Sequence, residues 1–306
     1  MADILNLIFS TEFAYSVIRV TTPILFAALA ALISNKAGVV NIGIEGIMLM
    51  AALVGVIGSA LTQSAFLGVV SAMVAGAIMA LILAYFALNL KTDIILGGIA
   101  LNLFATGGTV FLLYVVSGDR GVSSSLASLT VPQITIPIIN KIPVIGPILS
   151  GHNLLTYLSI VMVVIVSYFL YKTPTGLRIR AVGEASHAAS SVGISVRGIQ
   201  YKALVLSGVL SGLAGAYMSM GYLSMFSTNM TAGRGFIALA AEAMGRGTPL
   251  GTFLAALVFG FADALSNSLQ SLRIPAEFVQ MIPYLTTIIG LVVYSASKTS
   301  KAGKLK

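Results

Sequence analysis

The chain has 306 residues, of which 58% are hydrophobic and only 8% are charged, and its net charge is +8. A soluble domain carries about 25% charged residues. This composition therefore excludes a soluble globular protein and indicates a polytopic membrane protein. The absence of cysteine excludes disulfides, thiolate metal sites and thiol catalysis. The excess of basic residues indicates anchoring at an anionic cytoplasmic membrane surface rather than nucleic-acid binding.

Apolar runs with few or no charges predict an all-α polytopic membrane protein, a single transmembrane domain over residues 1–306 with about eight to ten helices, some of them broken. A helix needs about 20 apolar residues to cross the hydrocarbon core. In chain order the expected segments are 13–34, two within 46–90, then 94–118, 154–171, one within 203–233, the short 236–245, 250–265 and 278–294.

Two stretches and the tail are not expected to cross the membrane. Residues 118–153 contain four prolines, which block helical hydrogen bonding, so we expect an extracytoplasmic loop. Residues 172–202 and the tail 295–306 together hold nine of the 17 basic residues. Basic loops stay in the cytoplasm, so we expect a multi-pass protein of the cell (plasma) membrane with a cytoplasmic C-terminus. The placement of residues 1–12 is the weakest part of this topology.

The basic stretch 172–202 contains residues that predict a turn and a short helix within it. Pro174 and Gly176 indicate a turn. The Ala- and Ser-rich residues 184–192 predict a short helix closed by Gly193. A short helix of small residues between bases would form a protruding knob, although the same stretch fits a plain positive-inside connector.

Three polar residues interrupt the apolar segments, and ionisable or polar groups at such depth are costly. Glu45 has no basic residue three or four positions away, and Asn41 lies four residues before it, which predicts one shared helix face. Asn102 lies among the glycines of the segment 94–118. The three side chains are candidates for lining a translocation pathway, and hydrogen bonding between helices is the open alternative.

Two further acids have simpler explanations. Glu242 lies four residues before Arg246, which predicts an ion pair at the end of a helix. Asp263 is expected at an interface or a helix–helix contact. Because 39–49 and 233–245 each place one acid in a glycine-broken apolar segment, they suggest an internal repeat of the kind that transporters contain.

No enzymatic constellation is present in the sequence. There is no G-x-x-x-x-G-K-[ST] phosphate loop, no G-x-S-x-G and no H-E-x-x-H. His152 and His187 are isolated, so no metal site is expected. Energy for transport must therefore come from a partner or an ion gradient. The small residues of 207–216 are typical of close helix packing in lipid.

The stretch "GLRIRAVGEASHAASSVGISV" (176–196) closely resembles the cytoplasmic coupling loop of ABC-importer permeases of the branched-chain amino acid, ribose and nucleoside group. The pattern of that loop is matched by Gly176, Arg180, Ala181, Gly183, Ala188, Ala189, Gly193 and Ile194. The resemblance extends over nearly the whole chain, from "NIGIEG" (41–46) to "FGFADAL" (259–265).

The resemblance implies an all-helical transport subunit that is not an enzyme and binds no cofactor. It implies a lipid-embedded heterodimer with a second homologous permease, no nucleic-acid partner, and a cytoplasmic ABC ATPase that uses ATP and Mg. It also implies an extracytoplasmic substrate-binding protein or lipoprotein that delivers substrate. Coupling to the ATPase is expected from Gly176, Arg178, Arg180, Gly183, Glu184, Ala188, Ala189 and Gly193.

The stretch "NIGIEG" is most similar to nucleoside-type members, and the chain resembles the shorter permease of a guanosine-type importer. Glu242 departs from the apolar pattern expected at its position. We therefore expect nucleoside uptake by alternating access, with Asn41, Glu45 and Asn102 on the pathway. The alternatives are a permease for a simple sugar or branched-chain amino acid, and a proton-coupled secondary transporter with Glu45 as its proton site.

Overall fold

The computed structural model describes residues 10–137, 142–143, 145–269, 285–286 and 292. The expected segment 278–294 and the basic tail 295–306 lie almost entirely outside the described residues. The helices are α2 (Thr11–Lys36), α3 (Ile44–Thr62), α4 (Ala65–Ala84), α5 (Ile94–Ser117), α6 (Ile145–Leu149), α7 (Leu154–Lys172), α8 (Pro174–Glu184), α9 (Ser186–Ser191), α10 (Val196–Tyr217), α11 (Arg234–Met244) and α12 (Pro249–Leu269). Single π turns extend α4 (η1, Tyr85–Asn89) and α10 (η3, Met218–Tyr222).

Within the described part of the chain, seven helices are long and apolar enough to cross a membrane: α2, α3, α4 with η1, α5, α7, α10 with η3, and α12. This result confirms the all-helical membrane class. The expected segment 236–245 is instead the 11-residue helix α11, which spans about 16 Å and is too short to cross the hydrocarbon core alone.

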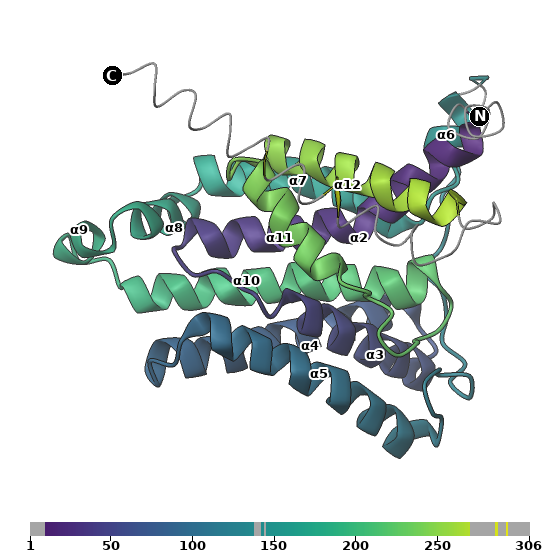
Figure 1. The fold of residues 1–306 in the computed structure, drawn as a ribbon, viewed down its shortest axis with the longest axis horizontal. Coiled ribbons are helices and arrows are strands. Elements are labelled where there is room, and N and C mark those ends of the chain that lie inside the picture. The colour runs from purple at the N-terminus through teal and green to yellow at the C-terminus, as the bar shows by residue number, and fades with distance from the viewer. Residues whose placement is uncertain (1–9, 138–141, 144, 270–284, 287–291, 293–306) are drawn as a thin grey trace.

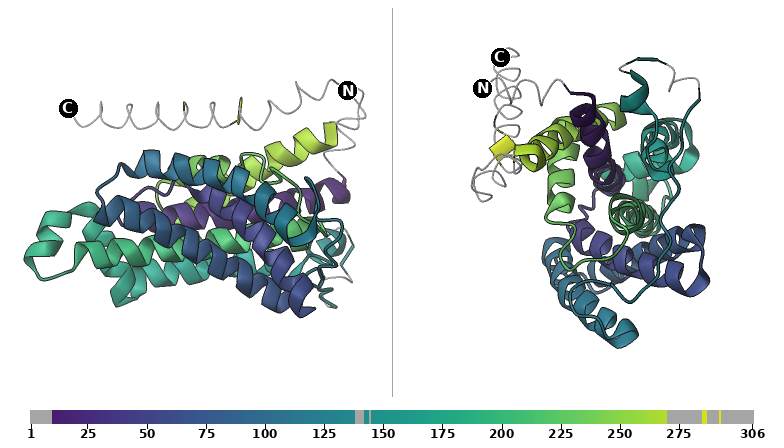
Figure 2. Two further views of the ribbon diagram at one scale, coloured as in Figure 1. Left: turned by 90° about the horizontal axis from the view of Figure 1, so that it is seen from below. Right: turned by 90° about the vertical axis from the view of Figure 1, so that its right-hand side faces the viewer.

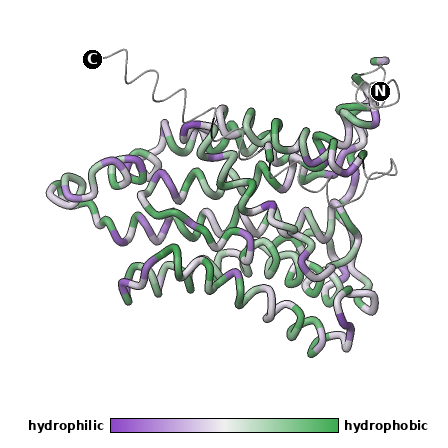
Figure 3. Tube along the Cα trace, viewed as in Figure 1, coloured by the Kyte–Doolittle hydropathy of each residue, from purple (hydrophilic) through white to green (hydrophobic). Residues whose placement is uncertain are grey.

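The long helices run along the length of the molecule, with α2, α3 and α10 at its centre (Figures 1 and 2). Most of α2 and α10 is buried, whereas 22% of the apolar window of α5 is buried. Apolar residues nevertheless predominate along α4, α5 and α7 (Figure 3). A helix that is apolar on its exposed side as well is suited to lipid, so these three helices form the outer surface of the bundle.

The two ends of the molecule are different in character. At one end α8 and α9 project from the bundle, and at the other the start of α2 meets the proline-rich loop (Figure 1). There the hydroxyl of Tyr15 donates to the carbonyl of Gly151 (3.0 Å). The loop 118–153 is mostly irregular, as expected, apart from the short α6. The proline-rich loop and the start of α2 therefore lie at the same end of the bundle.

Side-chain caps begin most of these helices, because backbone N–H groups without partners are costly in an apolar environment. Ser64, Asp93, Asn153 and Ser195 each accept a hydrogen bond from the first turn of the helix that follows. Thr173 does the same for α8, with Pro174 at its first position. The predicted turn at Pro174 is therefore wrong, because proline at the first position of a helix starts it without loss of a hydrogen bond.

The proline inside α2 is compensated by a neighbouring helix. Pro23 has no N–H to donate to the carbonyl of Arg19, four residues earlier. The hydroxyl of Tyr217, a buried residue of α10, donates to that carbonyl instead (2.9 Å). The broken helical bond is thus replaced by a contact that joins α2 to α10.

Small residues bring α4 and α10 into backbone contact. A Cβ atom on Gly76 would clash with the carbonyl oxygen of Gly208, and one on Gly212 would lie 2.6 Å from that of Ala72. Only glycine allows the two backbones to approach this closely, as the small residues of 207–216 predicted. Close backbone packing is a main source of helix association in lipid, where the hydrophobic effect does not drive it.

We expect Gly76→Ala to destabilise the protein by about 1–3 kcal/mol, because the added methyl overpacks the contact with the Gly208 backbone. Thermal unfolding in detergent measures the change. Gly107→Ala is the matched control, since a Cβ there meets nothing within 4 Å, and we expect it to alter stability by at most about 1 kcal/mol. Equal stability of the two variants would contradict this packing.

Candidate functional site

The site is a break between two membrane helices. Helix α2 ends at Lys36, α3 begins at Ile44, and residues 37–43 between them are not helical. Gly38 adopts a positive φ of 75°, a conformation that glycine reaches without steric cost. The break leaves backbone groups at the start of α3 without helical partners, and side chains from α5 and α10 contact it.

Glu45 binds the start of α11. One carboxylate oxygen accepts the N–H of Gly233 (2.8 Å) and the other accepts the N–H of Gly235 (2.6 Å). The first N–H groups of a helix lack helical partners and carry partial positive charge, so a carboxylate there is stabilising. A Cβ on Gly235 would lie 2.7 Å from the Cα of Glu45, so glycine is required for this approach. Glu45 therefore joins α3 to α11.

Asn102 closes the break from the side of α5. Its amide oxygen accepts the N–H of Gly46 (2.8 Å), and its amide nitrogen donates to the carbonyl of Ile42 (3.0 Å). These two backbone groups are four residues apart and would bond to each other in a continuous helix. The side chain of Asn102 thus takes the place of one missing helical hydrogen bond.

Asn41 faces a different helix. Its amide nitrogen donates to the hydroxyl of Ser207 on α10 (3.0 Å), and the whole residue is buried. The predicted shared face with Glu45 is wrong, because α3 begins at Ile44 and Asn41 precedes it. The amide oxygen of Asn41 is buried with no hydrogen-bond partner among the described residues.

Glu242 is held by the end of α2. Both of its carboxylate oxygens accept from the side-chain amide of Asn35 at 3.0 Å. The predicted ion pair with Arg246 is wrong, because α11 ends at Met244 and Arg246 lies beyond it with a positive φ of 55°. Glu45 and Asn35 thus bind opposite ends of α11. A polar pocket of about 390 Å³ lies beside Glu242 and is lined by Asn35, Lys36, Arg180, Gly183, Glu184, Glu242, Ala243, Arg246 and Gly247.

Asp263 is at a helix–helix contact, which is one of the two placements expected for it. Its carboxylate forms an ion pair with Arg234 at the start of α11 (2.9 Å). Arg234 and Asn35 were not singled out from the sequence, because their partners lie 29 and 207 residues away. The glycines around Arg234 were the available signal for a constrained helix start.

The expected coupling residues lie on α8 and α9, which form the predicted knob. Gly193 follows α9 with a positive φ of 81°, so the predicted closure of the short helix is confirmed. A Cβ on Gly176 would lie too close to the carbonyl of Phe169 in α7, and one on Gly183 too close to the carbonyl of Lys36 in α2. Helix α8 therefore packs directly on the ends of two membrane helices.

The other expected coupling residues divide by exposure. Ala189 of α9 is buried, whereas Arg178, Glu184 and Ala188 are exposed. Arg180 is partly buried and its guanidinium lies 4.7 Å from the ring centre of Tyr171. The knob thus has an anchored inner side and a free outer side.

The histidines have no metal-binding arrangement, and no cluster of metal-ligating side chains occurs among the described residues. His152 is buried in the loop before α7, stacks on Tyr15 at 4.0 Å, and places Nε2 2.8 Å from the carbonyl of Ile148. Burial lowers the pKa of His152, because desolvation disfavours the imidazolium. His187 is exposed on α9.

Seven apolar helices within the described residues, the short helix α11 and the projecting knob define a multi-pass membrane protein. The membrane subunit of a metal-chelate type ABC transporter, solved in an inward-facing conformation, has a similar fold: its TM-score is 0.51 at 15% identity over 95% of this chain and 87% of that one.

The family of branched-chain amino acid transport system permease components matches residues 13–291. The nucleoside ABC transporter permease protein NupC of Lactococcus lactis is 35% identical over 90% of this chain and 89% of its own. The guanosine ABC transporter permease protein NupQ of Bacillus subtilis is 35% identical over 95% and 92%. The chain belongs to this family and is a permease subunit of an ABC importer, a transport component and not an enzyme.

We expect Glu45→Gln to destabilise the protein by about 1.5–3 kcal/mol, because a glutamine amide replaces one of the two oxygens that accept from α11. Thermal unfolding in detergent without substrate measures this. Glu12→Gln, at an exposed position in the first turn of α2, is the matched control and should lower stability by less than about 1 kcal/mol. A Glu45→Gln chain of full stability that has lost uptake would instead assign the carboxylate to the ligand.

Proposed function

We propose that this permease takes up nucleosides by alternating access, driven by a partner ATPase. The nucleoside and guanosine permeases at 35% identity over most of the chain support the substrate class, as does the resemblance of "NIGIEG" to nucleoside-type members. The proposed assembly contains a second, homologous permease, a cytoplasmic ABC ATPase and an extracytoplasmic binding protein or lipoprotein. The chain itself has no phosphate-binding loop, so ATP and Mg are assigned to the ATPase.

The chemistry of the break favours a neutral solute that carries hydroxyl groups. Both oxygens of Glu45 are taken by backbone N–H groups, and Asn102 uses both ends of its amide on the backbone. The amide oxygen of Asn41 has no partner among the described residues. A hydroxyl or amine donor of a nucleoside would satisfy this acceptor when the pathway opens, and Glu45, the one charged residue within 37–46, is already engaged by α11.

The same geometry disfavours the proton-coupled alternative. Protonation of Glu45 would turn one of its two accepting oxygens into a hydroxyl and so disrupt at least one hydrogen bond to the start of α11. Hydrogen bonds to a charged group contribute about 1.5–3 kcal/mol each. Such a cost opposes repeated protonation and fits a carboxylate that holds the break together.

The observation that carries the mechanism is the contact between the knob and the break. Gly183 of α8 lies against the carbonyl of Lys36, and a Cβ on Gly38 would lie 3.4 Å from the Cα of Gly183. Residues 36–38 lead directly into the break that contains Asn41 and precedes Glu45. A displacement of α8 and α9 by the ATPase would therefore be transmitted to the break through a single backbone contact.

The proposed orientation places α8 and α9 in the cytoplasm. This end of the molecule gathers basic residues from separate segments, among them Lys36, Arg180 and Arg246, which line one pocket. Basic residues at membrane-helix ends favour the cytoplasmic side. The proline-rich loop then faces outward, where the binding protein would dock, and the C-terminus is proposed to be cytoplasmic.

The substrate proposal predicts that unlabelled nucleosides compete with labelled guanosine for uptake by the reconstituted importer, whereas ribose, glucose and leucine do not. Uptake should require ATP and continue when a protonophore removes the proton gradient. Competition by a sugar or an amino acid alone would contradict the substrate class. Proton-dependent uptake without an ATPase would contradict the mechanism.

The coupling proposal predicts that Gly183→Ala lowers uptake by the assembled importer about tenfold or more while ATP hydrolysis continues. The added methyl would clash with the carbonyl of Lys36 and shift α8 off the end of α2. Parallel assays of ATP hydrolysis and uptake in the same proteoliposomes measure the ratio. Ala181→Val, at an exposed position on the same helix, should keep the ratio, and an unchanged ratio in Gly183→Ala would overturn the contact's role.

A further inference from the structure

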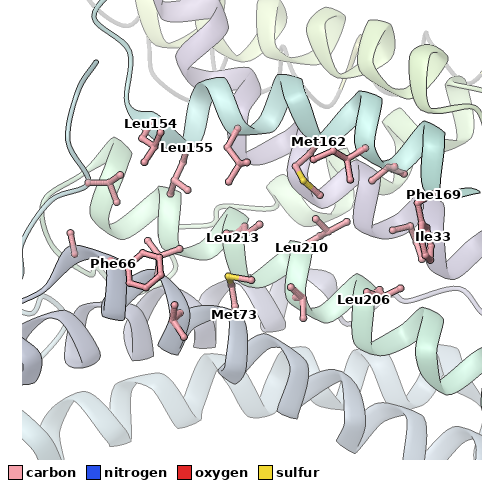
Figure 4. A pocket seen from close by; sticks show the side chains of 18 of the residues that line it. Ile33, Phe66, Met73, Leu154, Leu155, Met162, Phe169, Leu206, Leu210 and Leu213 are labelled. Carbon is pink, nitrogen blue, oxygen red and sulfur yellow. The ribbon is translucent and has the colours of Figure 1, made fainter. Parts of the chain in front are cut away.

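A long apolar groove lies on the outer surface of the bundle, away from the break. Helix α10 forms its floor, and α7 and the first half of α4 form its walls, with Ile33 of α2 at one end (Figure 4). Its volume is about 590 Å³, and every residue that lines it is apolar. A hydroxyl-rich solute would find no hydrogen-bond partner there, so the groove is not suited to the transport substrate.

The groove is long enough to hold an acyl chain of one leaflet. It extends along α7 from Leu154 to Phe169 (Figure 4), a distance of about 22 Å at the helical rise. The hydrocarbon core of a bilayer is about 30 Å thick, so the groove is longer than the apolar depth of a single leaflet. Phe66 and Ile165, both on its rim, are exposed at 74% and 47%, so the groove opens sideways to the membrane.

Two lysines lie where the groove ends on the side of α8 and α9. Lys172 is three residues beyond Phe169 on α7, and Lys202 is four residues before Leu206 on α10, so each lies on the face of its helix that lines the groove. Both are exposed, and neither forms a hydrogen bond or ion pair with the described residues. Arg178 lines a small pocket together with Lys202, so three cations gather at this end.

We propose that this groove binds an anionic phospholipid of the leaflet on the α8–α9 side. One acyl chain lies in the groove between α7, α10 and α4, and the phosphate lies between Lys172 and Lys202. The apolar length and the cationic mouth complement the two parts of such a lipid, because basic residues near the membrane surface attract anionic lipids. This site is independent of the proposed transport substrate.

The chain contains no tryptophan, so a single introduced tryptophan reports its own surroundings. We would place it at Val209, a half-buried groove residue seven positions from Lys202. The control is Val164 of α7, which is 69% exposed, lies outside the groove and is eight positions from Lys172. Both sites lie about 11–12 Å from their lysine at the helical rise, so the two probes report similar depths.

The full-length chain is reconstituted in equimolar phosphatidylcholine and phosphatidylglycerol, with brominated acyl chains on one lipid or the other. The surface charge is then constant, and only the identity of the quencher changes. At Val209→Trp we expect brominated phosphatidylglycerol to bind about fivefold or more tightly than brominated phosphatidylcholine, as one well-placed base implies. At Val164→Trp we expect equal quenching by both lipids.

The preference should disappear when Lys172→Gln and Lys202→Gln are added to the Val209→Trp chain. Lys91→Gln, an exposed lysine between η1 and α5, should leave it unchanged. Equal quenching by both lipids at Val209→Trp, or a preference that survives loss of both lysines, would overturn the proposal. So would absence of quenching, which would mean that protein fills the groove.

A second measurement needs no tryptophan variant. Native mass spectrometry of the unmodified chain, released from the same lipid mixture, should retain phosphatidylglycerol in preference to phosphatidylcholine, and the two lysine substitutions should remove that preference. Equal retention of both lipids by the unmodified chain would overturn the proposal even if the Val209→Trp chain failed to fold.

Discussion

The carboxylate of Glu45 holds together the least regular part of the molecule. Glu45 lies in the first turn of α3, and its carboxylate accepts hydrogen bonds from two backbone N–H groups at the start of α11. Lipid offers no water to satisfy a broken helix, so each interrupted segment must find partners within the protein. Glu45 supplies them for α11, and Asn102 supplies them for α3. An acid within an apolar segment is thus explained by the helix ends that it satisfies.

Because α11 is tied at both ends, it connects the two halves of the proposed mechanism. Glu45 binds its first turn beside the break, and Asn35 binds Glu242 in its last turn beside α8. Helix α8 packs through Gly183 on the same end of α2 that carries Asn35. The proposed coupling therefore needs no extended network of side chains. One short helix, α11, and one backbone contact connect α8 to the break before α3.

Local patterns predicted the elements well. Apolar runs with few charges located the membrane helices, small residues in 207–216 indicated a close helix contact, and Gly193 indicated the end of α9. The sequence did not predict contacts between residues that are far apart along the chain. Glu45 binds backbone N–H groups, which every residue except proline carries, so the sequence contains no signature of its partner. The prediction that Asn41 and Glu45 share a helix face is wrong because Gly43 is the N-cap of α3. The helix therefore begins after Asn41.

The most direct test of the central claim is hydrogen exchange of α11, residues 234–244, in a double-mutant cycle of Glu45→Gln and Asn35→Ala. If α11 is one body tied at both ends, either substitution should speed exchange along the whole helix. The double variant should then exchange little faster than either single variant, which is a clear departure from additivity. Additive effects, each confined to the turn nearest its substitution, would contradict the account.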